Sequence, residues 1–152
     1  MRVRGRHFFM GFLVATDGSA VSDGTVTHAA AEAGVWGRSL TIVHVLTPEP
    51  KLTDGELVLP GSEAAIESGK HVLDEAEQLA RDAADAHDCE LSVSTELLAG
   101  WPADTITEYA STHPTDGIFV GHRGQSAVSD DVLGSVAKSV LDKATVPVTI
   151  IK

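Results

Sequence analysis

Short apolar runs alternate along this chain with alanine-rich or amphipathic segments. Five segments have the length and apolar character of strands, at 8–16, 40–46, 90–98, 117–120 and 146–151. The segments between them predict four helices, at 19–33, at 62–87, from Pro102 onward and at 135–143. Strands and helices therefore alternate along most of the sequence.

The segment 62–87 gives the clearest helical pattern, because its small or apolar positions recur in steps of three and four with acidic residues opposite. Pro102 suits a first helical turn, and Asp104 then lies near the positive end of that helix. Gly34 is predicted to end the first helix. The prolines and glycines of 47–61 predict a loop without a long element.

This order of elements predicts an α/β fold. Apolar strands joined by helices imply a parallel sheet that is covered on both faces, and right-handed crossovers make it doubly wound. Ligands of such folds bind beyond the carboxyl ends of the strands, where the strand order reverses. Two segments fall at such ends, "TDGS" at 16–19 and "GHRGQSAVSDDVLGS" at 121–135.

The second of these segments has the glycine spacing of an anion site. It matches neither the Walker A loop nor the GxGxxG dinucleotide motif. Gly121 and Gly124 can take backbone angles closed to other residues, and they let a ligand approach the main chain. Gly134, Ser135 and Val136 open a helix, whose unpaired amides favour an anion. Alternatively, each glycine serves only a turn or a cap.

Charge and cysteine content narrow the classes of function. The 152 residues suit one domain, and 22 acidic against 11 basic residues give a formal charge of −11. Such a charge argues against nucleic-acid binding. It fits either an ordinary solvated surface or adaptation to high salt, as in a halophile. The single cysteine, Cys89, fits a cytoplasmic location, and no Cys/His cluster suggests zinc.

The N-terminus imitates a secretory signal, because "MRVRGRH" is basic and "FFMGFLVA" is apolar. No cleavage site follows, and so short a run cannot span a bilayer. We interpret it as a buried first strand and expect no membrane association. Residues 1–9 are predicted to be an extension upstream of a domain at 10–152, since Met10 also begins a sensible strand.

Several motifs in order resemble the universal stress protein family. The glycine pattern between the fourth strand and the fourth helix matches the nucleotide-binding signature of its ATP-binding branch. The resemblance covers nearly the whole chain, through "FLVATDGS" at 12–19, "LTIVHVL" at 40–46, "LLAGWPADTITEYA" at 97–110, "DGIFVGHRG" at 116–124 and "GSVAKSVLDKATVPVTIIK" at 134–152.

The resemblance implies strand order 3-2-1-4-5 and an ATP site. Asp17 is expected to contact the nucleoside, and the backbone of Val45 to bind adenine. The glycines and the serine are expected to hold ribose and phosphates, with His122 as a loop residue beside the ligand. The full expected set is Ala15, Thr16, Asp17, Val45, Gly121, His122, Arg123, Gly124, Gly134, Ser135 and Val136.

Two features of the loop oppose a polyphosphate. Gln125 stands where the family is often basic, and Asp130 and Asp131 add negative charge. Mg²⁺ would offset these charges, so we expect it to accompany the phosphates. Nucleotide binding should then weaken when salt and magnesium are both low.

Three functions stay open: an ATP-binding regulatory protein of the stress response, a weak ATPase or phosphotransferase, and a nucleotide-free dimeric scaffold. We favour the first. A triad of Asp17, His122 and Ser135 is disfavoured, because the GxSxG elbow is absent. A homodimer is expected through the edge strand at 146–151 (Val146 to Ile151), which carries almost no protecting charge.

Overall fold

A computed structural model of the chain describes residues 11–124 and 133–152. Its main sheet is parallel and has the strand order β5-β2-β1-β6-β7. These strands are β1 (Gly11–Ala15), β2 (Leu40–Leu46), β5 (Val93–Ala99), β6 (Thr115–Gly121) and β7 (Val148–Ile151). Numbered among themselves along the chain, they follow the order 3-2-1-4-5. The predicted doubly wound α/β fold is thereby confirmed.

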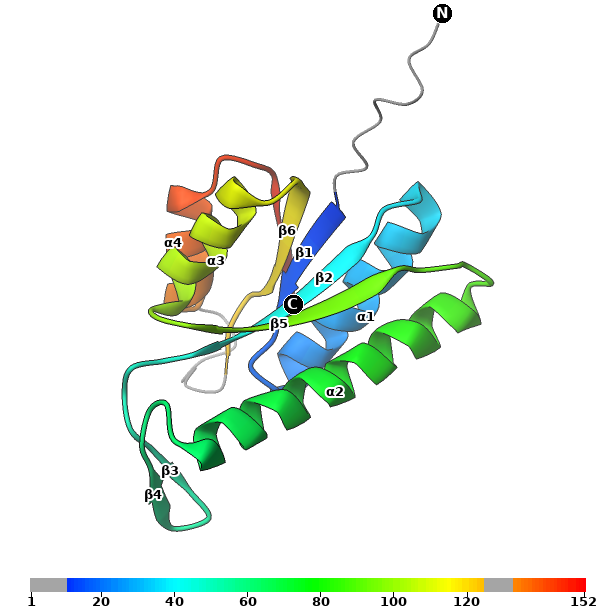
Figure 1. Cartoon of the computed structure of the whole chain (residues 1–152). Coiled ribbons are helices and arrows are strands. Elements are labelled where there is room, and N and C mark those ends of the chain that lie inside the picture. Colours follow the sequence, from blue (N-terminus) through cyan, green and yellow to red (C-terminus); the bar gives the residue numbers. More distant parts are fainter. Residues whose placement is uncertain (1–10, 125–132) are drawn as a thin grey trace, which may run out of the picture.

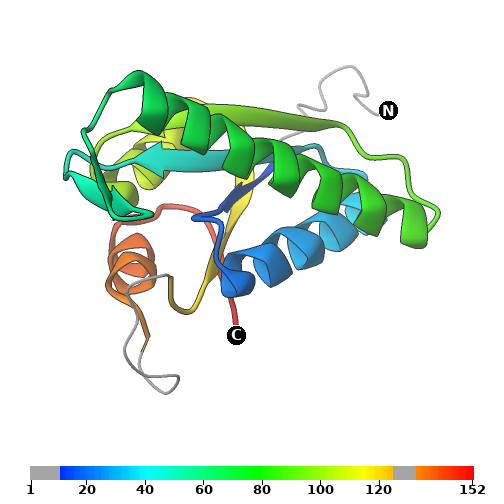
Figure 2. The ribbon, with the colours of Figure 1, turned by 90° about the horizontal axis from the view of Figure 1, so that it is seen from below.

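Two layers of helices cover the sheet (Figure 1). The helices are α1 (Ala20–Trp36), α2 (Glu63–Ala86), α3 (Pro102–Thr112) and α4 (Ser135–Lys143). Helices α1 and α2 pack on one face, and α3 and α4 pack on the other (Figures 1 and 2). Successive residues of the central strand serve opposite cores, since Val14 joins the first cluster and Leu13 the second. Strand β1 is thus buried on both sides.

The predicted end of the first helix at Gly34 is wrong. Helix α1 continues to Trp36 and ends at Gly37, whose φ of 65° is the left-handed conformation of a helix C-cap. Gly34 lies inside the helix, and a Cβ there would come within 2.8 Å of the Cβ of Cys89. This glycine therefore allows close packing, and it does not terminate the helix.

The segment 47–61, predicted as a loop, contains a small hairpin. Strands β3 (Lys51–Thr53) and β4 (Glu56–Val58) pair antiparallel. Between them Asp54 and Gly55 both have positive φ, at 52° and 81°, as in the tight turns that match strand twist. Each strand is short, so the expectation of no long element holds, but the pairing itself was missed.

The remaining boundaries differ from prediction by a few residues. Helix α2 has Ser62 and His87 as its caps, and α3 begins at Pro102 as expected. The third strand of the main sheet begins at Val93 and the last at Val148, each later than predicted. Residues 8–10 of the first predicted strand, and the predicted extension 1–9, lie outside the described residues.

Within residues 11–124 and 133–152, no helix combines the length and the apolar character that a membrane crossing requires.

Candidate functional site

A cavity of about 660 Å³ opens at the carboxyl edge of the parallel sheet. This volume is in the usual range for small-molecule sites, roughly 300–1,000 Å³. Its walls come from the ends of β1, β2 and β6, from the hairpin and from the first turns of α3 and α4. The lining residues are Ala15, Thr16, Asp17, Ser22, His44, Val45, Thr47, Glu49, Lys51, Pro102, Ile106, Val120, Gly121, Arg123, Gly124, Leu133, Gly134, Ser135, Val136, Ala137 and Lys138.

The structure brings the predicted site residues together in this cavity, with the exception of His122. The side chain of His122 is buried, and its Nδ1 has no hydrogen-bond partner among the described residues. Its backbone N–H donates to the carbonyl of Ile151 at 2.8 Å, and its carbonyl accepts from the N–H of Gly134 at 2.6 Å. His122 therefore ties the strand ends to α4 and does not line the cavity beside Asp17 and Ser135.

Asp17 is held by the start of α1. Its Oδ1 accepts from the backbone N–H of Ser19 and from the hydroxyl of Ser22, each at 2.9 Å. Ser19 is also the N-cap of α1, with its Oγ accepting from the N–H of Ser22. The local sequence thus caps the helix and orients the carboxylate with the same two serines.

Gly124 lies directly against this carboxylate. A Cβ at Gly124 would stand 2.5 Å from Oδ2 of Asp17, which is closer than real contacts allow. Any side chain at position 124 would have to displace Asp17 or the loop. The glycine therefore permits the main chain of the β6–α4 loop to approach Asp17.

Gly121 and Gly134 are also required by space. A Cβ at Gly121 would stand 2.8 Å from Cγ1 of Val21, and one at Gly134 would stand 3.1 Å from Cα of Arg123. None of the three site glycines has φ in the left-handed region. Gly121 and Gly124 therefore do not use the left-handed backbone angles that glycine alone adopts readily. Close approach of neighbouring segments is the reason for glycine here.

The first turn of α4 forms one wall of the cavity. Its N-cap is Gly134, which has no side chain to cap the amides of the turn. Ser135 and Val136 follow with exposed side chains, and Lys138 lines the cavity one turn along. An exposed helix N-terminus with hydroxyl and ammonium groups beside it favours a bound anion. The other loop residues singled out, Gln125, Asp130 and Asp131, lie outside the described residues.

His44 is the buried titratable group in the cavity wall. Its Nδ1 lies 2.7 Å from the carbonyl oxygen of Thr16. Burial lowers the pKa of the imidazole, the nearby ammonium of Lys51 lowers it further, and the Thr16 carbonyl and the Asp17 carboxylate partly offset both effects. The surroundings therefore favour the neutral form of the ring.

Sequence reasoning missed several residues of the wall. Ser22 and His44 gave no signal beyond that of a helix start and an apolar strand. Lys51 enters the cavity from the hairpin, whose path no local pattern indicates. Lys138 follows Ser135 by three positions in a predicted helix, so helical spacing could have placed it on the same side.

The comparisons with known proteins agree with this architecture. The model of the universal stress protein family matches residues 9–152. The chain belongs to the universal stress protein family. A universal stress protein of Thermus aquaticus is 33% identical over 147 residues, covering 95% of this chain and 99% of its own length. One from Methanocaldococcus jannaschii is 28% identical, covering 97% and 85%.

Solved structures of the family have the same fold. The universal stress protein of Archaeoglobus fulgidus aligns with a TM-score of 0.75 at 28% identity, covering 95% of this chain and 99% of its own. A structure of the A. fulgidus protein in complex with dAMP aligns at 0.72 and 26% identity, covering 95% and 98%. Some relatives are longer: this chain spans 47% of a universal stress protein of Mycolicibacterium smegmatis, at 30% identity.

Proposed function

We propose that this chain binds ATP in the cavity and acts as a nucleotide-dependent regulatory protein of the stress response. The observation that carries the proposal is the approach of the Gly124 main chain to Asp17, because a Cβ would fill that space. The uncapped first turn of α4 lines the same cavity. The A. fulgidus relative solved with dAMP supports an adenine nucleotide as the ligand.

The end of β2 suits the adenine ring. The backbone N–H of Thr16 donates to the carbonyl of Val43 at 2.9 Å, so Val43 directs its peptide groups toward β1. Alternate residues of a strand repeat that direction, which places the peptide groups of Val45 on the same side. Pairing of β1 with β2 stops at Ala15 and Val43. Val45 can therefore offer its backbone to the edge of a base, with Ile106 as an apolar wall.

The start of α4 suits the phosphates. Amides of the first turn and the hydroxyl of Ser135 supply donors, while Arg123 and Lys138 supply positive charge along the wall. Lys51 adds a third cation from the hairpin side. These groups favour a charged nucleotide over a neutral nucleoside.

Mg²⁺ would accompany the phosphates. The described residues contain no group of three or more His, Cys, Asp or Glu that could hold a metal ion, so the cavity fits a cation carried mainly by phosphate oxygens. Asp17 and Glu49 are the carboxylates in the described wall that could approach it. The ion would neutralise part of the negative charge of the phosphates. Affinity for ATP should consequently fall when magnesium and salt are both low.

Calorimetric titration with ATP tests the proposal. Ser135→Ala removes one donor and should weaken binding by roughly threefold to tenfold. Ser111→Ala, an exposed serine on α3 away from the cavity lining, is the matched control and should bind as the unaltered protein does. Absence of ATP binding by the unaltered protein, or equal affinity in both variants, would contradict the proposal.

The same samples decide whether the protein is an ATPase. A regulatory protein should bind ATP without steady release of phosphate. Phosphate release that is lost in Asp17→Asn or Ser135→Ala, with binding retained, would favour the weak ATPase or phosphotransferase instead.

We also propose a homodimer through the edge strand. In the described sheet β7 pairs with β6 alone, and its other edge is open. In β7, Val148 and Ile150 are half-buried and Thr149 is exposed. The strand carries no charged side chain that would discourage pairing with a second copy. Thr149→Lys should shift sedimentation from dimer to monomer. A monomer at high concentration for the unaltered protein would refute the proposal.

A further inference from the structure

One hydrogen bond joins β1 and β2 beyond the point where their ladder stops. The backbone pairing ends at Ala15 with Val43. At the next residue, the carbonyl of Thr16 accepts a hydrogen bond from Nδ1 of His44 at 2.7 Å. Both residues are buried, with His44 7% and Thr16 5% exposed. A side chain thus satisfies a buried carbonyl at the place where the strands part to form the cavity.

This contact fixes the tautomer of His44. A carbonyl oxygen can only accept, so Nδ1 must carry the hydrogen, and Nε2 of the neutral ring is an acceptor. The ring also lies close to Gly69 of α2, where an added Cβ would stand 3.4 Å from its Cδ2. The charged groups that act on it are Lys51 of the hairpin and Asp17 of the β1–α1 turn. Donation by Nδ1 is therefore a fixed property of the folded protein.

The side chain of the same residue, Thr16, takes part in the turn that follows. The Thr16 hydroxyl accepts from the N–H of Gly18 at 3.1 Å and donates to Oγ of Ser22 at 3.0 Å. The Ser22 hydroxyl in turn donates to Oδ1 of Asp17 at 2.9 Å. Thr16 therefore connects two sets of hydrogen bonds, one from its carbonyl to the imidazole of His44 and one from its hydroxyl through Ser22 to the carboxylate of Asp17.

We propose that His44 is a positioning residue that, through the carbonyl of Thr16, sets the turn presenting Asp17 to the cavity. The role of Asp17 toward a nucleotide rests on the proposed function, but its positioning by His44 is a property of the free protein. The two can be tested separately.

Solution NMR of the ligand-free protein tests the positioning. The imidazole nitrogen shifts of His44 should show hydrogen on Nδ1, and the amide signals of Gly18 and Ser19 should move in His44→Leu, which lacks the donor. In His44→Asn, whose side-chain nitrogen can stand near the place of Nδ1, these signals should return toward their original positions. Hydrogen on Nε2, or unmoved Gly18 and Ser19 amides in the leucine variant, would overturn the proposal.

A matched control separates this effect from the general loss of a histidine. His71 on α2 has a largely exposed side chain that contacts Glu75, and His71→Leu should leave the Gly18 and Ser19 amides in place. If His44→Leu fails to fold, the comparison of His44→Asn with the unaltered protein still decides, because rescue predicts near-identical amide signals. Large shifts in His44→Asn would count against the proposal.

ATP titration gives the second readout. His44→Leu should weaken binding on the order of tenfold, the equivalent of one net hydrogen bond, and His44→Asn should recover most of it. If the unaltered protein does not bind ATP, the proposed function fails while the amide signals still decide the role of His44. If the unaltered protein binds ATP and both variants bind it as tightly, the positioning role fails while the proposed function stands.

Discussion

Glycine occurs at the cavity because individual neighbouring atoms leave too little space for a Cβ. Gly124 faces a carboxylate that is already held by two donors from the start of α1, so Asp17 cannot turn aside without breaking them. Gly24 of α1 is the opposite case, because nothing lies within 4 Å of a Cβ added there. The same substitution should therefore act with opposite sign at the two positions.

Gly124→Ala should lower the free energy of unfolding by about 1–3 kcal/mol and weaken ATP binding, since the new methyl group displaces Asp17. Gly24→Ala should raise the free energy of unfolding by roughly 0.5–1 kcal/mol, because alanine is the better helix former. Urea unfolding of both variants measures the two effects. Equal and small changes would show that the loop yields to the methyl group.

His44 makes the stability of the fold depend on pH. Its pKa is lowered in the folded state from the ordinary value of 6.5, so the unfolded chain binds more protons than the folded one in the window below 6.5. The contribution of neutral His44 to the free energy of unfolding is complete above that window and is lost as the pH falls through it. His44→Asn cannot titrate, and its unfolding free energy should therefore decline less between pH 7 and 5. A decline of His44→Asn identical to that of the unaltered protein would contradict this role of His44.

The sequence could indicate the cavity residues that have a glycine or acidic signature, and their assembly in one cavity follows from the strand order. His44 could not be found in this way, because a histidine inside an apolar run looks like any strand residue until its partner, Thr16, is known. His122 was misplaced for a related reason. Its position in the glycine loop suggested the ligand side, whereas its backbone bonds to Ile151 and Gly134 place it with the strand ends.

At the scale of elements, periodic segments were predictable and tertiary contacts were not. Helix α2 buries a regular stripe that includes Leu73, Ala76 and Ala80, which the spacing alone reveals. Gly34 was misread because its contact with Cys89 involves residues far apart in the sequence. The hairpin had an available local signal, Asp54–Gly55 between short polar and apolar alternations, which is typical of a two-residue turn.

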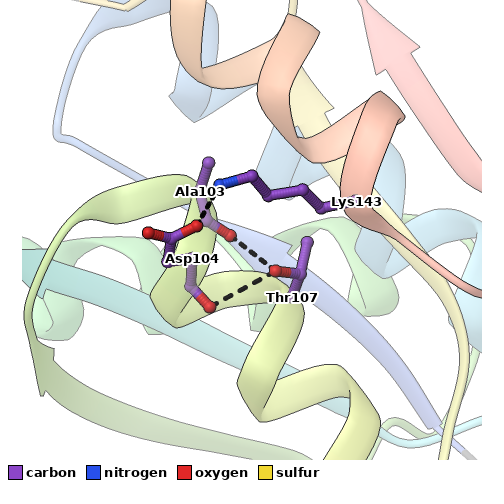
Figure 3. A network of polar contacts seen from close by, with 4 residues as sticks. All are labelled: Ala103, Asp104, Thr107 and Lys143. Carbon is purple, nitrogen blue, oxygen red and sulfur yellow. Dashed lines mark hydrogen bonds and ion pairs between the residues drawn. The ribbon is translucent and has the colours of Figure 1, made fainter.

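Helices α3 and α4 are joined across the second face by an ion pair between Asp104 and Lys143 (Figure 3). Asp104 lies in the first turn of α3, and Lys143 lies in the last turn of α4. The hydroxyl of Thr107 donates to the carbonyls of Ala103 and Asp104 in the same turn of α3. Both side chains are about half exposed. Each charge also complements the dipole of its own helix.

A double-mutant cycle of Asp104→Ala and Lys143→Ala should therefore give a coupling energy below about 1 kcal/mol, because water screens the pair. Each single variant should lose slightly more than the coupling, since it also loses the favourable interaction with a helix end. Thermal or urea unfolding supplies the values. A coupling well above that bound would mean that the pair is shielded from solvent.

For the molecule as a whole, the net charge of −11 sets the response to salt. The Debye length falls from roughly 30 Å at 0.01 M to about 3 Å at 1 M salt, so repulsion among the acids should weaken as KCl is added. The melting temperature should rise over that range. In Asp74→Asn/Asp85→Asn, which removes two exposed charges of α2, the rise should be smaller. A melting temperature indifferent to KCl would exclude self-repulsion as a significant cost.

The cavity takes its walls from positions as distant in sequence as Ala15 and Lys138. No short fragment can carry it, since its walls meet only after several crossovers have closed. A bound ligand would thus link segments that could otherwise open one at a time, and its free energy would be added to the global transition. Hydrogen exchange should then slow on both faces of the sheet together when ligand is bound, far beyond the residues that touch it.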